Sequence, residues 1–160
     1  MNFFKQFSEP IVYSTAIITA ATMIIVGKIG IKFSKNVHSN EFIKEKLKTE
    51  PLKIIVISAV AAPLFEELVY RKLIFGWLRT YSKPLAYGLS SFLFAFEHYG
   101  FNFKYLIKEL KTDFINVPVF TFNGFALAYA YDSSNCILTS ILAHCINNTL
   151  SMVSQYYDLD

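Results

Sequence analysis

The sequence predicts an all-α fold, a polytopic membrane helix bundle of about five transmembrane helices. Three observations indicate it. Of the 160 residues, 54% are hydrophobic and only 17% are charged, whereas a soluble domain carries roughly 25% charged residues. Long stretches of the chain carry no charge, and a few ionisable residues interrupt the others. This composition excludes a disordered chain, and the net charge of +3 is too small to indicate a nucleic-acid partner.

Five apolar segments account for the predicted helices. Residues 10–27, 114–131 and 133–157 contain no Asp, Glu, Lys or Arg. Roughly 20 mainly apolar residues cross a bilayer as a helix, and a backbone in lipid must satisfy its own hydrogen bonds. Two further apolar stretches are interrupted by charges. The predicted spans are about 10–32, 53–78, 84–100, 114–131 and 134–157.

The most polar part of the chain lies between the first two spans. Residues 28–53 hold seven of the fifteen basic residues, and we predict a basic loop there rather than a short surface helix over 39–48. The positive-inside bias places this loop in the cytoplasm. The same count places three further lysines on that side: Lys104, Lys108 and Lys111. Without repeats or linkers, residues 1–160 are predicted to form one integral-membrane domain.

The most informative charges are those inside apolar segments. An ionisable group in a membrane helix is costly, so it usually faces the bundle interior and indicates a functional site. Glu66, Glu67 and Arg71 interrupt the second span. Glu67 and Arg71 are four residues apart and can pair on one helix face, while Glu66 lies about 100° away around the axis. A neutralised pair that lets the helix sit in the membrane is the structural alternative.

Two more polar clusters lie on other segments. Glu97 and His98 end the third span, and His144, Asn147 and Asn148 lie within the last one. His144 and Asn148 are four residues apart and share a face. Each cluster alone has a structural interpretation, such as a hydrogen bond between helices. Together they predict side chains that meet at membrane depth, because each of them needs a polar partner there.

These residue types favour peptide hydrolysis without a serine or cysteine nucleophile. A glutamate in a water-poor pocket can take a proton from water and pass it to a leaving amine, and histidine and asparagine can donate to an oxyanion. The first alternative is a zinc site of His98, His144 and Glu66, although the HExxH spacing is absent. The second is a proton relay in a transporter. We expect no cofactor.

The two cysteines, Cys136 and Cys145, are nine residues apart in one predicted helix. That separation is too long for a local disulfide on a straight helix, and no CxxC-type metal spacing exists. A small apolar role in the core is expected for both.

The three clusters resemble the motifs of a known family. Glu66 to Arg71 fits EExxxR, Phe94 to His98 fits FxxxH, and His144 to Asn148 fits HxxxN. In this order the motifs resemble those of the CAAX protease and bacteriocin-processing (CPBP/Abi) family of intramembrane endopeptidases. The resemblance covers a motif-bearing core of about residues 54–155.

The resemblance implies a role for each motif residue. Glu66 would activate the attacking water and His98 would help to hold and deprotonate it. His144 and Asn148 would form the oxyanion hole, and Glu67 and Arg71 would support the site. It also implies an integral protein of the bacterial cytoplasmic membrane that acts on membrane peptides or proteins, in bacteriocin self-immunity or peptide maturation.

One departure from the family pattern leaves an alternative open. Family members usually carry more helices before EExxxR, whereas one clear span precedes it here. A second copy or a partner subunit is therefore a candidate to complete the site. The short chain also keeps a non-catalytic bacteriocin immunity or binding protein as the alternative to a protease.

Overall fold

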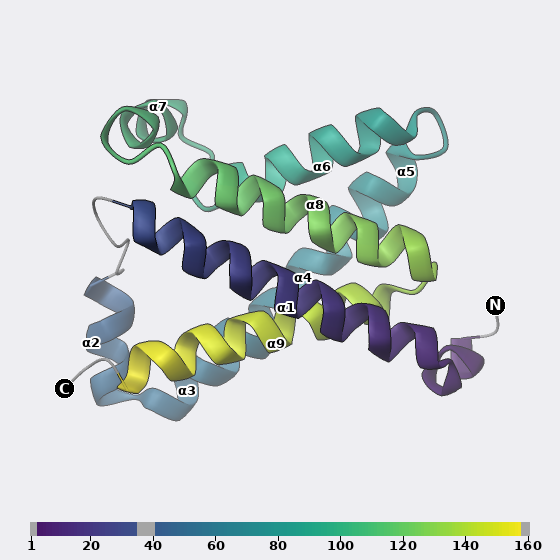
Figure 1. The fold of residues 1–160 in the computed structure, drawn as a ribbon, viewed down its shortest axis with the longest axis horizontal. Helices are drawn as coiled ribbons and strands as arrows, with labels where there is room; N and C mark the ends of the chain where they lie inside the picture. Colours follow the sequence, from purple (N-terminus) through teal and green to yellow (C-terminus); the bar gives the residue numbers. More distant parts are fainter. Residues whose placement is uncertain (1–2, 35–40, 158–160) are drawn as a thin grey trace.

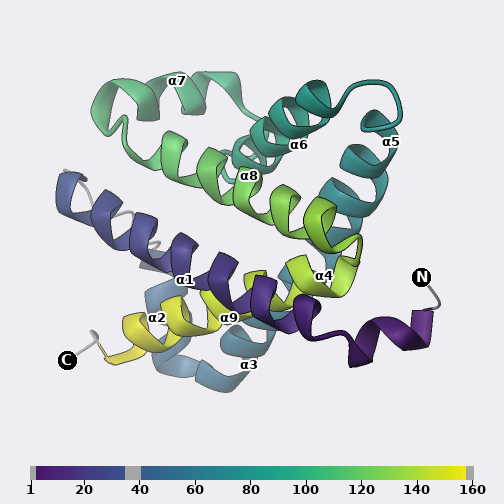
Figure 2. The same ribbon diagram turned by 45° about the vertical axis from the view of Figure 1, so that its right-hand side comes forward.

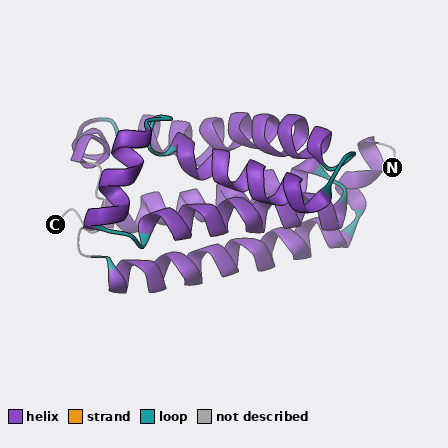
Figure 3. Cartoon of the chain, turned by 90° about the horizontal axis from the view of Figure 1, so that it is seen from above, coloured by secondary structure: helices purple, strands orange, loops and turns teal. Residues whose placement is uncertain are grey.

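The computed structural model describes residues 3–34 and 41–157, and within these residues all regular structure is helical (Figure 3). The all-α prediction is confirmed. The elements before the second predicted span are η1 (Phe3–Ser8), α1 (Pro10–Phe33) and α2 (Glu41–Thr49). The second span is built from α3 (Pro51–Val56), η2 (Ile57–Ala61), α4 (Ala62–Glu67), η3 (Leu68–Phe75) and α5 (Gly76–Leu78). The remaining elements are α6 (Lys83–Glu97), α7 (Phe103–Thr112), α8 (Asn116–Ser134) and α9 (Ile137–Tyr157).

Local sequence signals explain where several helices begin and end. Proline stands at the start of α1, α3 and α6, where its missing N–H has no intrahelical partner to lose. The Asn102 side chain accepts hydrogen bonds from two backbone N–H groups and caps α7. Asn135 adopts a left-handed conformation with φ 49° after α8, which ends that helix and turns the chain into α9.

The five long helical segments meet in one apolar core. Figures 1 and 2 show α6 beside α8, with α1 running between α8 and α9. Small side chains let α1 approach its neighbours closely, and larger ones from the other segments fill the space. The buried residues of this core are Ala16, Ala20, Met23, Tyr70, Phe94, Leu127 and Ala143. The core therefore draws on α1, η3, α6, α8 and α9.

The outer surface of the bundle is rich in large apolar side chains. Ile17, Ile18 and Ile25 of α1 are exposed to 61%, 66% and 58%, which is expected of a face that contacts lipid rather than water. Among the described helices, α1 alone has both the length and the hydropathy of a membrane-crossing helix, with a mean hydropathy of 1.8 and 28% of its apolar window buried. The number of crossings stays a prediction.

The prediction of a loop over residues 28–53 is wrong for most of that range. The first helix continues to Phe33, residues 41–49 form α2, and α3 begins at Pro51, while residues 35–40 lie outside the described part. Leu47 is fully buried and anchors α2 to the bundle. Glu50 follows α2 and pairs with Lys53 at 2.7 Å and Lys46 at 3.5 Å; Lys53 mainly holds the pKa of Glu50 below its usual value.

The lysine-rich parts of the chain gather at one end of the bundle. Figure 1 shows α2 and α7 at the same end as the C-terminal end of α1, and the turn between α5 and α6 at the opposite end. This arrangement agrees with the prediction that residues near 28–53 and the lysines of α7 share one side. The helix α7 was not predicted from the sequence.

A close approach of α6 and α8 depends on a glycine. A Cβ atom on Gly124 would lie 2.9 Å from the Ser91 Cα and 3.0 Å from its carbonyl oxygen, which is too close for any real Cβ. We expect Gly124→Ala to lower the free energy of unfolding by roughly 1–3 kcal/mol, because the helices must separate. Gly88, on α6, has nothing within 4 Å of its added Cβ.

Thermal unfolding in detergent measures the difference between these two variants. Gly88→Ala should leave the protein unchanged or stabilise it by up to about 1 kcal/mol, because alanine is the better helix former. Equal stability of the two alanine variants would contradict a tight crossing at Gly124.

A polar cluster joins the α5–α6 turn to the end of α8, just beyond the predicted fourth span. Asp132 accepts from Lys83 at 3.0 Å, Arg79 at 3.3 Å and the Tyr87 hydroxyl at 3.2 Å. Burial acts to raise the pKa of Asp132, but the hydrogen bonds and charges of these three side chains outweigh it and lower the pKa.

We expect Asp132→Asn to lower the stability by about 0.5–1 kcal/mol at neutral pH, because Lys83 is largely exposed and screened by water. A carboxyl group whose pKa is lower in the folded protein than in the unfolded chain, where it is about 4, stabilises the fold above that pH. This stabilisation is lost as the pH falls. The gap between wild type and variant should therefore close below about pH 4. A gap that persists at low pH in thermal melts would refute this role.

Candidate active site

The EExxxR segment lies between two stretches of π-helix. Glu66 and Glu67 end α4, and Arg71 lies in η3. The segments η2 and η3 on either side both have π-helical hydrogen bonding, which is rare and occurs most often at functional sites. In Figure 1 α4 lies near the middle of the bundle's long axis. Both glutamates are thus held at mid-bundle by a backbone that departs from regular α-helix.

Glu67 is fully enclosed and its charge is paired. Arg71 Nε lies 3.2 Å from Glu67 Oε2, and both side chains have zero exposure. The Nε–H bond does not point at that oxygen, so the contact is a charge pair rather than an aligned hydrogen bond. Arg71 also donates from Nη2 to the Gly124 carbonyl at 3.1 Å. The predicted pairing of residues 67 and 71 is present.

His144 completes the environment of Glu67. Its Nδ1 lies 2.9 Å from Glu67 Oε1. The residue His144 is buried, with 3% exposure. A carboxylate accepts hydrogen bonds, so this contact assigns a proton to Nδ1. The other ring nitrogen, Nε2, then faces Glu66. A carboxylate that fixes the tautomer and the orientation of a histidine is a common arrangement in catalytic and metal sites.

Glu66 differs from its neighbour. Its Oε2 is buried but makes no hydrogen bond to the described residues, and it lies 3.8 Å from His144 Nε2, which is too long for a hydrogen bond. The side chain keeps 18% exposure. Adjacent glutamates therefore have different environments: Glu67 is fully enclosed with two charged or hydrogen-bonding partners, and Glu66 is partly exposed with no hydrogen bond to His144.

His98 packs against an aromatic ring that also contacts two other motif residues. The Phe94 ring is 5.0 Å from the His98 ring and 5.6 Å from the His144 ring, and the Arg71 guanidinium stacks over it at 4.5 Å. His98 follows α6 in a turn, is exposed in the isolated chain, and contacts Phe120 at 4.2 Å. Its Nδ1 donates to the Phe94 carbonyl at 3.0 Å, because a carbonyl only accepts. Nε2 is therefore the acceptor of the neutral ring.

Asn148 contacts backbone rather than another motif residue. Its Nδ2 donates to the Ser58 carbonyl at 3.0 Å, and its Oδ1 accepts from Asn147 Nδ2 at 3.1 Å. The structure thus brings Glu66, Glu67, Arg71 and His144 into one cluster. Asn148 lies one turn further along α9, and His98 is linked to the cluster by its contact with the Phe94 ring.

The family described as type II CAAX prenyl endopeptidase Rce1-like matches residues 48–150, a range that contains all three motifs. This chain belongs to that family. The "Putative membrane peptidase YdiL" of Bacillus subtilis (strain 168) is 29% identical over 118 residues. No solved structure matched.

The Rce1-like assignment confirms the family resemblance and supports a membrane protein of a peptidase family. The aligned region covers 74% of this chain but 43% of the Bacillus subtilis relative. The chain therefore spans less than half of that relative's length.

The sequence left open a zinc site in which His98, His144 and Glu66 would be the ligands. Across residues 3–34 and 41–157, no group of three or more His, Cys, Asp and Glu side chains has an arrangement that could hold a metal ion. In particular, the Phe94 ring packs against both histidines. The three proposed ligands do not converge as a tetrahedral zinc site would require.

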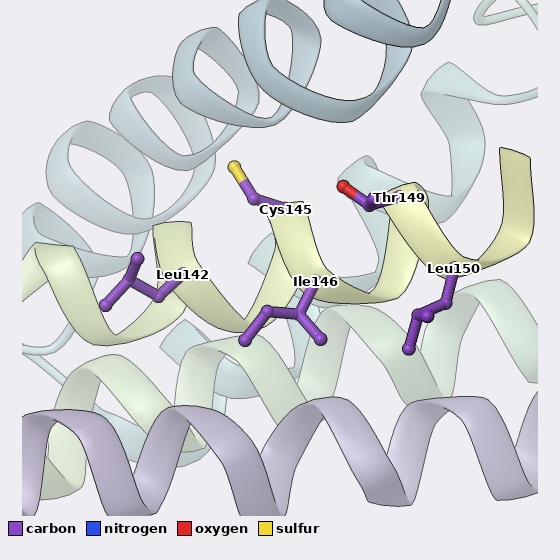
Figure 4. Close-up of a pocket in the computed structure, with 5 residues that line it drawn as sticks. All are labelled: Leu142, Cys145, Ile146, Thr149 and Leu150. Atoms are coloured by element: carbon purple, nitrogen blue, oxygen red, sulfur yellow. The ribbon is translucent and has the colours of Figure 1, made fainter. Parts of the chain in front are cut away.

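A surface groove of about 270 Å³ runs along α9, and none of the candidate site residues lines it. In Figure 4 Cys145 and Thr149 point up from α9, Ile146 and Leu150 point down, and Leu142 lies to their left; all five line the groove. Cys136 is buried as expected, but it precedes α9 instead of sharing that helix with Cys145. Both cysteines are free.

Sequence reasoning missed the residues that contribute backbone atoms to the site. Gly124 provides the carbonyl that accepts from Arg71, and Ser58 provides the one that accepts from Asn148. A glycine in an uncharged segment and a proline three residues before Glu66 were the only local signals. Neither residue type by itself identifies which carbonyl a distant side chain will reach.

Removing Arg71 tests the buried pair. We expect Arg71→Met to lower the free energy of unfolding by roughly 3–5 kcal/mol, because it leaves the Glu67 charge buried without its cation. Lys72→Met is the matched control: Lys72 is the next residue and is exposed, so its loss should change stability by less than about 0.5 kcal/mol. Thermal melts in one detergent compare the two, and similar melting temperatures would argue against the pair as a structural anchor.

Proposed function

We propose that this chain is an intramembrane endopeptidase of the glutamate type, which hydrolyses peptide bonds in membrane-associated peptides or proteins. The observation that carries the proposal is the contrast between the two glutamates. Glu67 has no exposure and is held by an ion pair with Arg71 and a hydrogen bond from His144, whereas Glu66 keeps 18% exposure and lies 3.8 Å from His144 Nε2, beyond hydrogen-bond distance. Membership of a CAAX-type peptidase family supports the same reaction class.

Glu66 is the general base of the proposed reaction. Its carboxylate takes one proton from a water molecule, and the hydroxide oxygen attacks the carbonyl carbon of the scissile peptide. The C–N bond of the resulting tetrahedral species then breaks, and the proton held by Glu66 passes to the leaving nitrogen. The products are a carboxylic acid and an amine, so the carboxylate is regenerated without any other reagent.

His144 is proposed to face the oxyanion. Glu67 holds Nδ1–H, so a second proton on Nε2 turns that nitrogen into a donor directed toward the Glu66 side of the site. A donor fixed before reaction stabilises developing negative charge at little reorganisation cost. Glu67 and Arg71 act through His144 as positioning residues. Asn148 has two amide N–H groups, and one of them already donates to Ser58.

His98 is proposed to assist the water from the Phe94 side. Its Nδ1–H is committed to the Phe94 carbonyl, which leaves Nε2 to accept a hydrogen bond when the ring is neutral. Closure of the site onto a substrate would have to bring His98 and Glu66 to the same water. Catalytic contacts often tighten only in the complex with substrate.

We propose an integral membrane location, in the bacterial cytoplasmic membrane, with a membrane peptide as substrate. Bacteriocin self-immunity and peptide maturation are the proposed roles. The alternative is a non-catalytic immunity protein that binds a bacteriocin or its receptor. A second copy of this chain or a partner subunit is a further proposed partner.

Cleavage of a membrane-anchored fluorogenic peptide in proteoliposomes tests the proposal. We expect Glu66→Gln to reduce kcat by about 100-fold or more, because the general base is lost. Glu45→Gln, which changes an exposed glutamate of α2, is the matched control and should retain full activity. Cleavage at equal rates by wild type and Glu66→Gln would reject the mechanism. If neither protein cleaves but both protect cells from a bacteriocin, the binding alternative is favoured.

A further inference from the structure

The turn before the two glutamates leaves a backbone carbonyl without a helical partner. In an α-helix the Ser58 carbonyl would accept from the N–H of Ala62, four residues later. In η2 that N–H instead donates to the Ile57 carbonyl, five residues back. The next residue is Pro63, which has no N–H to offer. Ser58 is thus deprived of both the α-helical and the π-helical donor.

Asn148 supplies the missing donor from another helix. Its Nδ2 lies 3.0 Å from the Ser58 carbonyl oxygen. The neighbouring Asn147 donates to Asn148 Oδ1 at 3.1 Å, so both contacts agree on which way the Asn148 amide points. A carbonyl without a partner is costly inside a membrane protein, and Pro-containing membrane helices tolerate the break when a neighbouring side chain satisfies it.

The hydrogen bond between Asn148 and Ser58 lies next to the turn that carries the two glutamates. Ser58 lies in η2, directly before the α4 turn that carries Glu66 and Glu67, and Pro63 is fully enclosed within α4. On α9, Asn148 is one turn from His144, which contacts both glutamates. The segment 57–67 is therefore attached to the same face of α9 at two points, one at a backbone carbonyl and one at the carboxylates.

We propose that Asn148 is a positioning residue, which caps the Ser58 carbonyl left open by Pro63 and so fixes Glu66 opposite His144. This role differs from the oxyanion donor that the family resemblance implies for Asn148. Its catalytic part rests on the proposed function, but the cap itself does not.

A double-mutant cycle between Asn148 and Pro63 tests the proposal. Pro63→Ala restores an N–H that can donate within the helix, so the cap becomes dispensable. We expect Asn148→Ala to lower kcat by about ten-fold or more with KM changed less than about two-fold. In the Pro63→Ala background the same change should cost less than about three-fold. An oxyanion donor would show the same loss in both backgrounds, and that result would overturn the proposal.

The melting temperature gives a readout that needs no substrate. Asn148→Ala should lower it by about 3 °C, in line with one hydrogen bond, and by clearly less when Pro63 is alanine. If Asn148→Ala does not fold, the double variant should, and an unfolded double variant counts against the proposal. Thr149→Val, a polar change in the groove on α9, is the control and should leave both kcat and melting temperature unchanged.

The two readouts separate the two proposals. If the melting temperatures show coupling between Asn148 and Pro63 but the wild type cleaves no peptide, the cap is supported and the proposed function is rejected. A cleaving wild type whose kcat and melting temperature both lack coupling would reject the cap alone.

Discussion

The buried pair of Glu67 and Arg71 is the interaction on which the site depends. A charge in the interior of a membrane bundle is costly unless it is paired and hydrogen-bonded. Neither side chain is exposed, and each has a further partner on another helix. Arg71 reaches the Gly124 carbonyl on α8, and Glu67 reaches His144 on α9. The need to satisfy two charges thus joins three segments that are far apart in the sequence.

Because of this pair, the two adjacent carboxylates have different environments. Successive residues of a helix project about 100° apart, so Glu66 meets His144 only at the second ring nitrogen, at 3.8 Å. Glu67 is fully enclosed by its ion pair and its hydrogen bond, whereas Glu66 keeps 18% exposure and makes no hydrogen bond to His144. His144 lies between them, with Nδ1 toward the first and Nε2 toward the second. This asymmetry is what allows one motif to supply both a support and a reactive group.

Backbone irregularity brings the segments to these positions. Pro63 and the two π-helical stretches change the direction of side chains along the second span, and the free Ser58 carbonyl provides a polar contact for α9. Close packing also positions these segments, because Gly124 lets α8 approach α6 at Ser91. Departures from regular helix and a missing side chain are costly elsewhere in a protein, and here they lie beside the candidate site.

The sequence by itself determined the all-α class, the five helical segments and the i, i+4 pair of Glu67 and Arg71, because these depend on composition, periodicity and local spacing. It did not determine that residues 41–49 are helical, because the burial of Leu47 depends on packing against the rest of the bundle. Only the tertiary structure decided that the Phe94 ring packs against His144 and that Asn148 binds the Ser58 carbonyl. Each of these two contacts joins residues dozens of positions apart, so it depends on how helices pack and not on any local pattern.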